Sequence, residues 1–152
     1  MEDYEVISDN IKIKWHENFD IKDQRYTQVS AFIYNDKNEL LIVKNETWTL
    51  PGGHPEEGET KEETLRREVM EETCSTIKDL HYIGAVEVIE NNEKYYQLRY
   101  TARLDELLDY VPEYETSERK LVKLDDLYDY VTWGKGKTFQ EQLASSKKIW
   151  NI

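Results

Sequence analysis

Three glutamates in the middle of the chain have the spacing of a cation-binding site. Glu68, Glu71 and Glu72 are related as i, i+3 and i+4, so on a helix their carboxylates share one face. Carboxylates this close repel one another unless a positive charge lies among them. Hard ions such as Mg²⁺ take carboxylate oxygens and complete their shell with water and substrate phosphates. Such an ion can also acidify a bound water, so this segment indicates metal-dependent phosphate chemistry.

The glutamates belong to a segment that we expect to be helical over 61–73. Thr60 and Glu63 fit a capping box, in which a hydroxyl and a carboxylate satisfy free backbone N–H groups at a helix start. Leu65 and Val69 are also four residues apart but on another face. This pattern predicts a helix that buries one side and turns its acids toward a cleft.

The residues before this helix predict a tight loop that runs to Glu59. Pro51 lacks a backbone donor, and Gly52 and Gly53 allow backbone angles that other residues avoid. With no side chain at either glycine, the carbonyl and amide groups can approach a phosphate or a metal closely. The loop and the helix together therefore predict one site.

Alternating apolar residues predict a sheet around this site. The polar turn 35–38 joins two of the expected strands into a hairpin, and the turn 91–93 joins two more. A loosely helical apolar pattern follows near the C-terminus, with Phe139, Leu143 and Ile149. The expected strands cover residues 11–15, 27–34, 40–43, 80–90, 96–104 and 120–124.

The size and charge of the chain limit its partners. Its 152 residues allow one domain with a real core and leave no room for a second, so we expect a single domain over 1–152. The 20 Lys and Arg against 32 Asp and Glu give a net charge of -12, which opposes binding of long nucleic acids. A small polyphosphate would also be repelled unless divalent cations lie between it and the carboxylates.

Cysteine usage and hydropathy bear on the compartment. The single Cys74 cannot form an internal disulfide, and the segment 1–4 lacks the basic and apolar regions of a signal peptide. No stretch approaches the roughly 20 apolar residues that a membrane-spanning helix needs. We therefore expect a cytoplasmic protein that does not enter a membrane.

The residues around the glutamates resemble the signature of the Nudix (MutT-like) hydrolases. That signature is Gly, five residues, Glu, seven residues, Arg-Glu, an aliphatic residue, any residue, Glu-Glu, any residue, Gly and an aliphatic residue, and here it covers residues 53–75. It departs at its end, where Cys74 and Ser75 replace the Gly and the aliphatic residue. Glycine there supplies a left-handed helix C-cap, a conformation that costs another residue about 1–2 kcal/mol. The residues in register are Gly53, Glu59, Arg67, Glu68, Val69, Glu71 and Glu72.

The resemblance implies a fold and a set of roles. The fold would be α/β (α+β), a three-layer α/β/α sandwich around a mixed β-sheet, with the signature helix on one face and a C-terminal helix on the other. Arg67 and Glu59 would form the supporting shell that orients the metal ligands. The ligands of Mg²⁺ or Mn²⁺ would be Glu68, Glu71 and Glu72, with a carbonyl of Gly52 or Gly53.

The reaction implied by the resemblance is attack of water on phosphorus. The bond cut would be a phosphoanhydride in a nucleoside triphosphate, or in a nucleoside diphosphate linked to another group. The general base would be Glu115 or Glu118 on a later loop, with Glu68 as the alternative. Members of the family are often dimers, so a homodimer is also compatible with the resemblance.

Other functions compete with this interpretation. A nucleotide-sensing module would keep the fold and lose catalysis, and the complete set of acids argues against it. A Glu-rich helix could also be a solvated or protein-binding face with ion pairs such as Arg67 to Glu71, although the glycine loop in register disfavours that hypothesis.

Several single residues have two interpretations. His54 could touch phosphate, although a lone His in a loop is more often only exposed. Cys74 is expected to be a small, partly buried side chain rather than a nucleophile. The turn 133–137 holds two glycines and two lysines but lacks the spacing of a phosphate-binding loop, so we expect it at the surface. Stacking on a nucleobase, or packing in the core, is open to Trp48, Tyr95, Tyr96 and Trp133.

Overall fold

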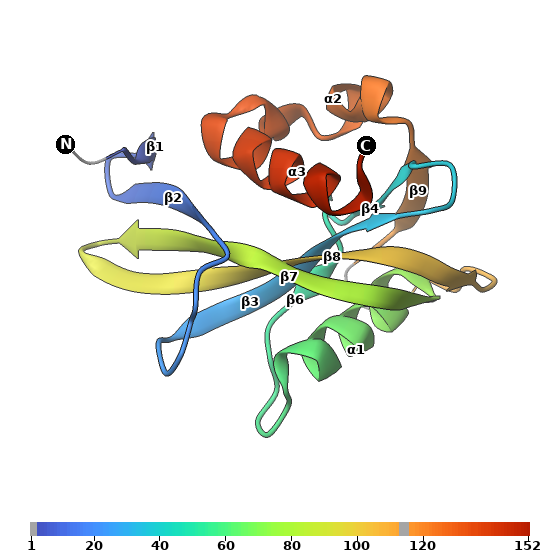
Figure 1. Ribbon diagram of the computed structural model, residues 1–152, viewed down its shortest axis with the longest axis horizontal. Coiled ribbons are helices and arrows are strands. Elements are labelled where there is room, and N and C mark those ends of the chain that lie inside the picture. Colours follow the sequence, from blue (N-terminus) through green and yellow to red (C-terminus); the bar gives the residue numbers. More distant parts are fainter. Residues whose placement is uncertain (1–2, 113–115) are drawn as a thin grey trace.

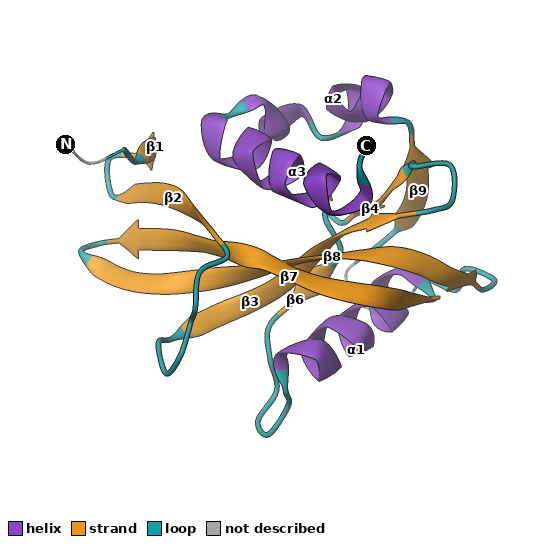
Figure 2. Cartoon of the chain, in the orientation of Figure 1, coloured by secondary structure: helices purple, strands orange, loops and turns teal. Residues whose placement is uncertain are grey.

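The computed structural model describes residues 3–112 and 116–152, in which one nine-stranded sheet carries helices on both faces (Figure 1). One long helix lies on one face, and the C-terminal helices lie on the other (Figure 2). The predicted three-layer sandwich is confirmed. No helix of this part of the chain is long and apolar enough to cross a membrane. The helices are α1 (Lys61–Thr73), α2 (Leu127–Tyr130) and α3 (Lys137–Trp150), with 3₁₀ turns η1 (Leu124–Asp126) and η2 (Thr132–Lys135).

The strands follow one another in the sheet in an order different from that of the chain. They are β1 (Glu5–Ser8), β2 (Ile11–Glu17), β3 (Tyr26–Tyr34), β4 (Leu40–Lys44), β5 (Trp48–Thr49), β6 (Gly52–Gly53), β7 (Ser75–Glu90), β8 (Glu93–Leu107) and β9 (Glu118–Val122). Neighbours run β1-β2-β7-β8-β3-β4-β5, while β6 pairs with β3 and β9 pairs with β4. The sheet is mixed because β3 lies parallel to β8, whereas β7 is antiparallel to both β2 and β8.

Strand β3 is buried on both faces because helices cover both sides of the sheet. Ala31 and Ile33 belong to the core under α1, together with Leu65 of that helix. Phe32 and Tyr34 belong to the core under α3. The alternation expected over 27–34 therefore has large side chains on both faces. Each fully buried side chain of this kind contributes about 1.5–3 kcal/mol to stability.

Several strand boundaries differ from the sequence-based prediction. β7 begins at Ser75 rather than at 80, and β1 was not predicted at all. β9 covers 118–122 instead of 120–124 because it pairs residue by residue with the five residues of β4, from Leu40↔Val122 to Lys44↔Glu118. The limits of a strand are thus set by its partner, which the sequence of the strand does not specify.

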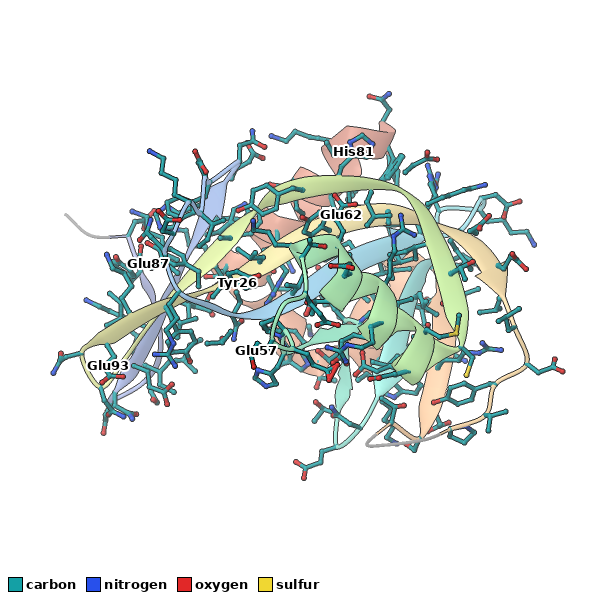
Figure 3. All side chains as sticks on the ribbon, turned by 90° about the horizontal axis from the view of Figure 1, so that it is seen from below. Tyr26, Glu57, Glu62, His81, Glu87 and Glu93 are labelled. Atoms are coloured by element: carbon teal, nitrogen blue, oxygen red, sulfur yellow. The ribbon has the colours of Figure 1, made fainter. Side chains whose placement is uncertain are left out.

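Helix α1 crosses only part of its face of the sheet (Figure 3). The parts of β7 and β8 that carry Glu87 and Glu93 extend beyond the helix. There the side chains of Tyr4 and of His16 in β2 meet Glu87, which accepts a hydrogen bond from Tyr4 and lies 2.7 Å from Nε2 of His16. Strand β2, paired with β7, thus widens the sheet beyond the end of α1.

The N-terminal segment also fixes the start of α3. Gly136 is the N-cap of this helix and has no side chain to accept a backbone donor. Glu5 of β1 supplies the acceptor, because its Oε1 receives the Thr138 N–H at 2.7 Å, and Lys137 pairs with Asp3 at 2.5 Å. A carboxylate at a helix N-terminus satisfies a free donor and opposes the positive end of the helix dipole. β1 therefore braces α3 over the sheet.

Candidate functional site

The start of α1 is fixed by the capping box that the sequence predicts. The Thr60 hydroxyl accepts the Glu63 N–H at 3.1 Å, and the Glu63 carboxylate accepts the Thr60 N–H at 2.8 Å. Leu65 and Val69 are fully buried against the sheet. Cap and core together set the rotation of the helix, which turns its acidic face toward the glycines of β6.

The end of α1 is left-handed although no glycine is present. Cys74 adopts φ 50° and ψ 46°, and its N–H donates to the carbonyl of Met70. Arg119 of β9 reaches the same end and donates to the carbonyls of Thr73 and Leu108, both at 2.6 Å. A cation that binds the last carbonyls of a helix is stabilising. It offsets the cost of about 1–2 kcal/mol for Cys74 in this conformation.

One cleft of about 480 Å³ gathers most of the predicted site residues. It contains the three glutamates of α1 and both glycines of β6, together with three polar side chains that the sequence did not single out. Those three, at positions 28, 45 and 116, come from other elements and carry no local motif. The cleft is lined by Gln28, Asn45, Gly52, Gly53, His54, Glu68, Glu71, Glu72 and Thr116.

The two glycines are required for different reasons. A Cβ on Gly53 would lie 2.5 Å from the carboxyl carbon of Glu68, so this carboxylate packs directly on the glycine. Gly52 has φ +150°, and its Cβ would lie 2.3 Å from both the Val29 carbonyl and the Ser30 hydroxyl. The tight loop expected here is therefore wrong at its start, because Gly52 and Gly53 form β6, whose pairing with β3 leaves no space for a side chain at Gly52.

Gly52 also orients one of the acids. Its N–H donates to Oε1 of Glu72 at 2.7 Å. The backbone of β6 thus holds Glu72 toward the cleft. The Cα of Gly53 lies against the Glu68 carboxylate. Because β6 is paired with β3, the sheet fixes where the acidic face of α1 lies.

Arg67 connects the remaining acids. Its Nε and NH2 donate to the two oxygens of Glu59 at 2.7 and 3.1 Å, a bidentate pair. Its NH1 donates to Glu68 at 2.9 Å and to Glu71 at 3.2 Å. A bidentate arginine pair has a fixed geometry, so Glu59 holds the guanidinium and the guanidinium holds two glutamates of the cleft. NH2 also donates to the His54 carbonyl, which ties the loop to the helix.

The charges of the site affect its ionisation. The hydrogen bonds from Arg67 lower the pKa of Glu59 to about 2, helped by the backbone N–H of Glu56. Glu59 in turn raises the pKa of Arg67. Burial raises the pKa of Glu68, although Arg67 opposes this shift. One arginine thus stands among several carboxylates, which leaves the cleft negative.

The cleft fits a hard divalent cation in the chemistry of its donors. Carboxylates of one helix face and the backbone of Gly52 and Gly53 offer oxygen, the ligand atom that Mg²⁺ and Mn²⁺ take. Within residues 3–112 and 116–152, no three His, Cys, Asp or Glu side chains already converge as metal ligands do. Instead, Glu68 and Glu71 each direct an oxygen to Arg67, and Glu72 directs one to Gly52.

Glu118, one of the residues proposed as general base, does not line the cleft. It begins β9 and its carboxylate lies 3.7 Å from Nζ of Lys44, its neighbour on β4. Strand pairing therefore takes this acid away from the glutamates of α1. Glu115 lies outside the described residues. Glu68 is the one of the three candidates that the structure brings into the cleft.

A second cavity, the sheet pocket, lies between the sheet and α3. Its volume is about 510 Å³, and it is lined by Gln28, Ser30, Gln97, Arg99, Phe139 and Gln142 among others. Gln28 lines the cleft as well, so the two cavities share a wall. The sequence did not predict this pocket, because its polar lining residues in the strands form no recognisable motif.

The four aromatic residues considered for stacking divide into two pairs. Tyr95 and Trp133 line the sheet pocket. Tyr96 lies on the opposite face and stacks on Phe19 with 4.8 Å between ring centroids. Trp48 packs beside Tyr130, and its carbonyl accepts the indole N–H of Trp133. Tyr95 and Trp133 also pack on core residues, the latter on Phe139, so only this pair combines core contacts with a place in the pocket wall.

The family of this chain is shown by comparison with known proteins. A family model described as NUDIX domain matches residues 24–142. The chain belongs to the Nudix family, whose hydrolases act on acid anhydrides and generally use divalent cations.

The solved structures that share this fold include two whose matches cover most of both chains. The pyrophosphohydrolase BsRppH of Bacillus subtilis superposes with a TM-score of 0.78 at 21% identity, and the match covers 91% of each chain. The NUDIX domain of Shewanella oneidensis NrtR, solved with ADP ribose, superposes with a TM-score of 0.62 at 19% identity. That match covers 88% of this chain and 93% of the other.

A sequence relative comes from Bacillus subtilis (strain 168) and is provisionally described as an 8-oxo-dGTP diphosphatase. It is 40% identical over 52 residues. The match covers 32% of this chain and 35% of the relative. The chain therefore spans about a third of the length of the curated relative that it matches.

Proposed function

We propose that this protein hydrolyses a phosphoanhydride bond in a nucleoside triphosphate, or in a nucleoside diphosphate linked to another group. The observation that carries this proposal is the network in which Arg67, held by Glu59, contacts Glu68 and Glu71 beside the glycines of β6. Family membership supports the same chemistry.

Glu68, Glu71 and Glu72 would hold Mg²⁺ or Mn²⁺, with a carbonyl of Gly52 or Gly53 as a further ligand. When bound, the cation would neutralise phosphate charge and lower the pKa of a coordinated water. Arg67 and Glu59 would orient the carboxylates, as supporting residues of metal ligands do. The negative cleft would then attract the cation first and a polyphosphate only with it.

Among the candidates for the general base, we assign the proton transfer to Glu68. Its carboxylate lies in the cleft against Gly53, whereas Glu118 is paired with Lys44 outside it. A base must come within hydrogen-bond reach of the water that it activates. Position therefore favours Glu68 as the base, in addition to its place beside Glu71 and Glu72 among the ligands of the cation.

The relatives support a nucleotide as the substrate. One is described as a diphosphatase of 8-oxo-dGTP, and one fold neighbour was solved with ADP ribose. Both molecules contain a nucleoside attached to phosphoanhydride-linked phosphates. A cleft of about 480 Å³ for phosphates beside a second cavity of about 510 Å³ accommodates such a two-part molecule.

The test is turnover by the purified protein with Mg²⁺ or Mn²⁺ and a panel of nucleoside triphosphates, oxidised nucleotides, dinucleoside polyphosphates, sugar nucleotides and ADP-ribose. Products are separated by chromatography. We expect metal-dependent cleavage that Glu72→Gln abolishes and that Glu118→Gln, the matched control outside the cleft, retains. Unchanged activity in Glu72→Gln would contradict the proposal. Nucleotide-dependent stabilisation without any cleavage would support a sensor instead.

A further inference from the structure

A buried arginine without an acidic partner forms the floor of the sheet pocket. Arg99 is 9% exposed, and no carboxylate pairs with it in the part of the chain that the structure describes. It donates instead to three amide oxygens, those of Gln142 at 3.0 Å, Gln28 at 3.1 Å and Gln97 at 3.1 Å. Burial lowers the pKa of Arg99 to about 10, so the guanidinium remains charged at neutral pH.

This arginine fixes the orientation of the three amides. A guanidinium can only donate hydrogen bonds, whereas a glutamine amide has one accepting and one donating end. The oxygen of each glutamine must therefore face Arg99, and each NH2 group must turn away from it. All three side chains line the sheet pocket. Within the described chain, none of the three NH2 groups donates to a protein acceptor, so the floor offers donors.

The walls of the pocket suit a flat ring. Val86 and Val88 of β7 and Phe139 of α3 are apolar, and Tyr95 and Trp133 add aromatic faces. A pocket with apolar walls and a few fixed polar groups is the usual form of a small-molecule site. An aromatic ring between these walls would place its polar edge against the amides.

The pocket also adjoins the cleft. Gln28 lines both cavities. Ser30 of the sheet pocket lies so close to Gly52 of the cleft that a Cβ on the glycine would be 2.3 Å from the Ser30 hydroxyl. A ligand whose phosphates lie at the glutamates can therefore extend its other end into the sheet pocket.

We propose that the sheet pocket binds the nucleobase of the substrate and selects bases that present a carbonyl oxygen over bases that present an amino group at the same position. Hypoxanthine and guanine would be preferred to adenine, and uracil to cytosine. The proposal rests on the proposed function, because the phosphates must occupy the adjoining cleft.

The selectivity follows from the amides' inability to turn. A carbonyl oxygen accepts hydrogen bonds from the NH2 groups, whereas an exocyclic amine faces them donor to donor. Rotation of a glutamine would point its NH2 at Arg99, which cannot accept. Buried donors left without a partner weaken binding strongly. The acid in the described lining, Glu5, already accepts the Thr138 N–H, so the floor itself offers no carboxylate to an amine.

Two pairs of nucleotides, each with one oxo and one amino base, test the selectivity. Inosine and adenosine nucleotides differ in the group at position 6 of the base and in the proton on N1, as uridine and cytidine nucleotides do at position 4 and on N3. Binding of the monophosphates, which contain no phosphoanhydride bond to cut, is measured by calorimetry with Mg²⁺ present, and kcat/KM of the triphosphates with Mg²⁺ is measured separately. We expect the oxo member of each pair to be favoured at least about tenfold in both assays. Equal binding of the two members overturns the proposal.

The two assays separate this inference from the proposed function. Preferential binding of IMP over AMP without cleavage of any triphosphate would leave the pocket assignment standing and defeat the enzymatic one. Cleavage with no preference within either pair would do the reverse.

Isosteric variants test the donors themselves. In Gln97→Glu and Gln142→Glu, one carboxylate oxygen still accepts from Arg99, so the fold is retained, while the NH2 donor becomes an acceptor. We expect the preference for the oxo ligand to fall at least about tenfold. Gln24→Glu, an exposed site with the same change of charge, should leave it unchanged. An oxo preference that survives both pocket variants rules out these amides as its source.

Discussion

The guanidinium of Arg67 lies between Glu59 and Glu68, donating to the former from Nε at 2.7 Å and to the latter from NH1 at 2.9 Å. Both acids thus accept hydrogen bonds from one guanidinium, whose donors lie in a fixed plane. Because NH1 also reaches Glu71, the geometry of two cleft carboxylates depends on a residue that need not touch the substrate.

Arg67→Lys should therefore lower turnover while leaving the fold intact. Lysine keeps the charge but cannot form the bidentate pair with Glu59. Loss of supporting residues around metal ligands typically costs about 10–100-fold in metal affinity or activity. We expect such a loss in the Mg²⁺ affinity, measured by titration of activity against the cation, with an unchanged circular dichroism spectrum. Wild-type Mg²⁺ affinity in the variant would show that Arg67 does not position the carboxylates.

Glu59 should make the protein sensitive to acid. Its folded-state pKa, about 2, lies below the ordinary 4.5 because Arg67 binds the ionised form. A depressed pKa stabilises the fold above the ordinary value, and this stability is lost as the pH falls from 4.5 through about 2. Urea unfolding across that window should show a shallower pH dependence for Glu59→Gln than for the wild type. Parallel pH profiles for the two proteins would refute this account.

Gly53→Ala should reduce turnover much more than it reduces the stability of the fold. The added Cβ would meet the Glu68 carboxylate at 2.5–2.7 Å, so the carboxylate must move. Gly58→Ala is the matched control, because Gly58 has φ +83° but no atom within 4 Å of an added Cβ. The control should lose about 1 kcal/mol of stability from backbone strain and keep its turnover. If both variants retain turnover, the contact between Gly53 and Glu68 is not functional.

Cys74→Gly should stabilise the protein. Glycine adopts the left-handed conformation of this C-cap without the side-chain penalty, so we expect a gain of about 1 kcal/mol in urea unfolding. Arg119→Met should act in the opposite direction, because the carbonyls of Thr73 and Leu108 lose their donor. A Cys74→Gly protein less stable than the wild type would mean that the thiol contributes more than the backbone strain costs.

The beginning of α1 could be predicted from the sequence because all its determinants are local. Thr60 and Glu63 are three residues apart and satisfy each other's backbone. The end at Thr73 also agrees with the prediction, but its stabilising partner could not be predicted, because the cation that binds the last carbonyls is Arg119, 46 residues beyond Thr73. The residues near Cys74 in the sequence do not indicate that Arg119 will bind there.

The candidate site shows the same division. The glutamates and glycines were predicted from their spacing, and the structure gathers them in one cleft. Glu118 was misplaced because its position depends on pairing with Lys44 in β4. The sheet pocket was missed because Gln97 and Arg99 alternate with buried apolar residues and resemble the solvent face of a strand. Gln97 and Arg99 form the floor of a pocket only because α3 lies over that face of the sheet.

The wall that Gln28 contributes to both cavities has an evolutionary consequence. Gln97 and Gln142 border the sheet pocket alone, so mutation there can retune which base is accepted while the hydrolytic apparatus is inherited unchanged. Position 28 has no such freedom, since any replacement must suit Arg99 on one side and the acidic cleft on the other. New specificities in this lineage should therefore arise at the far amides first.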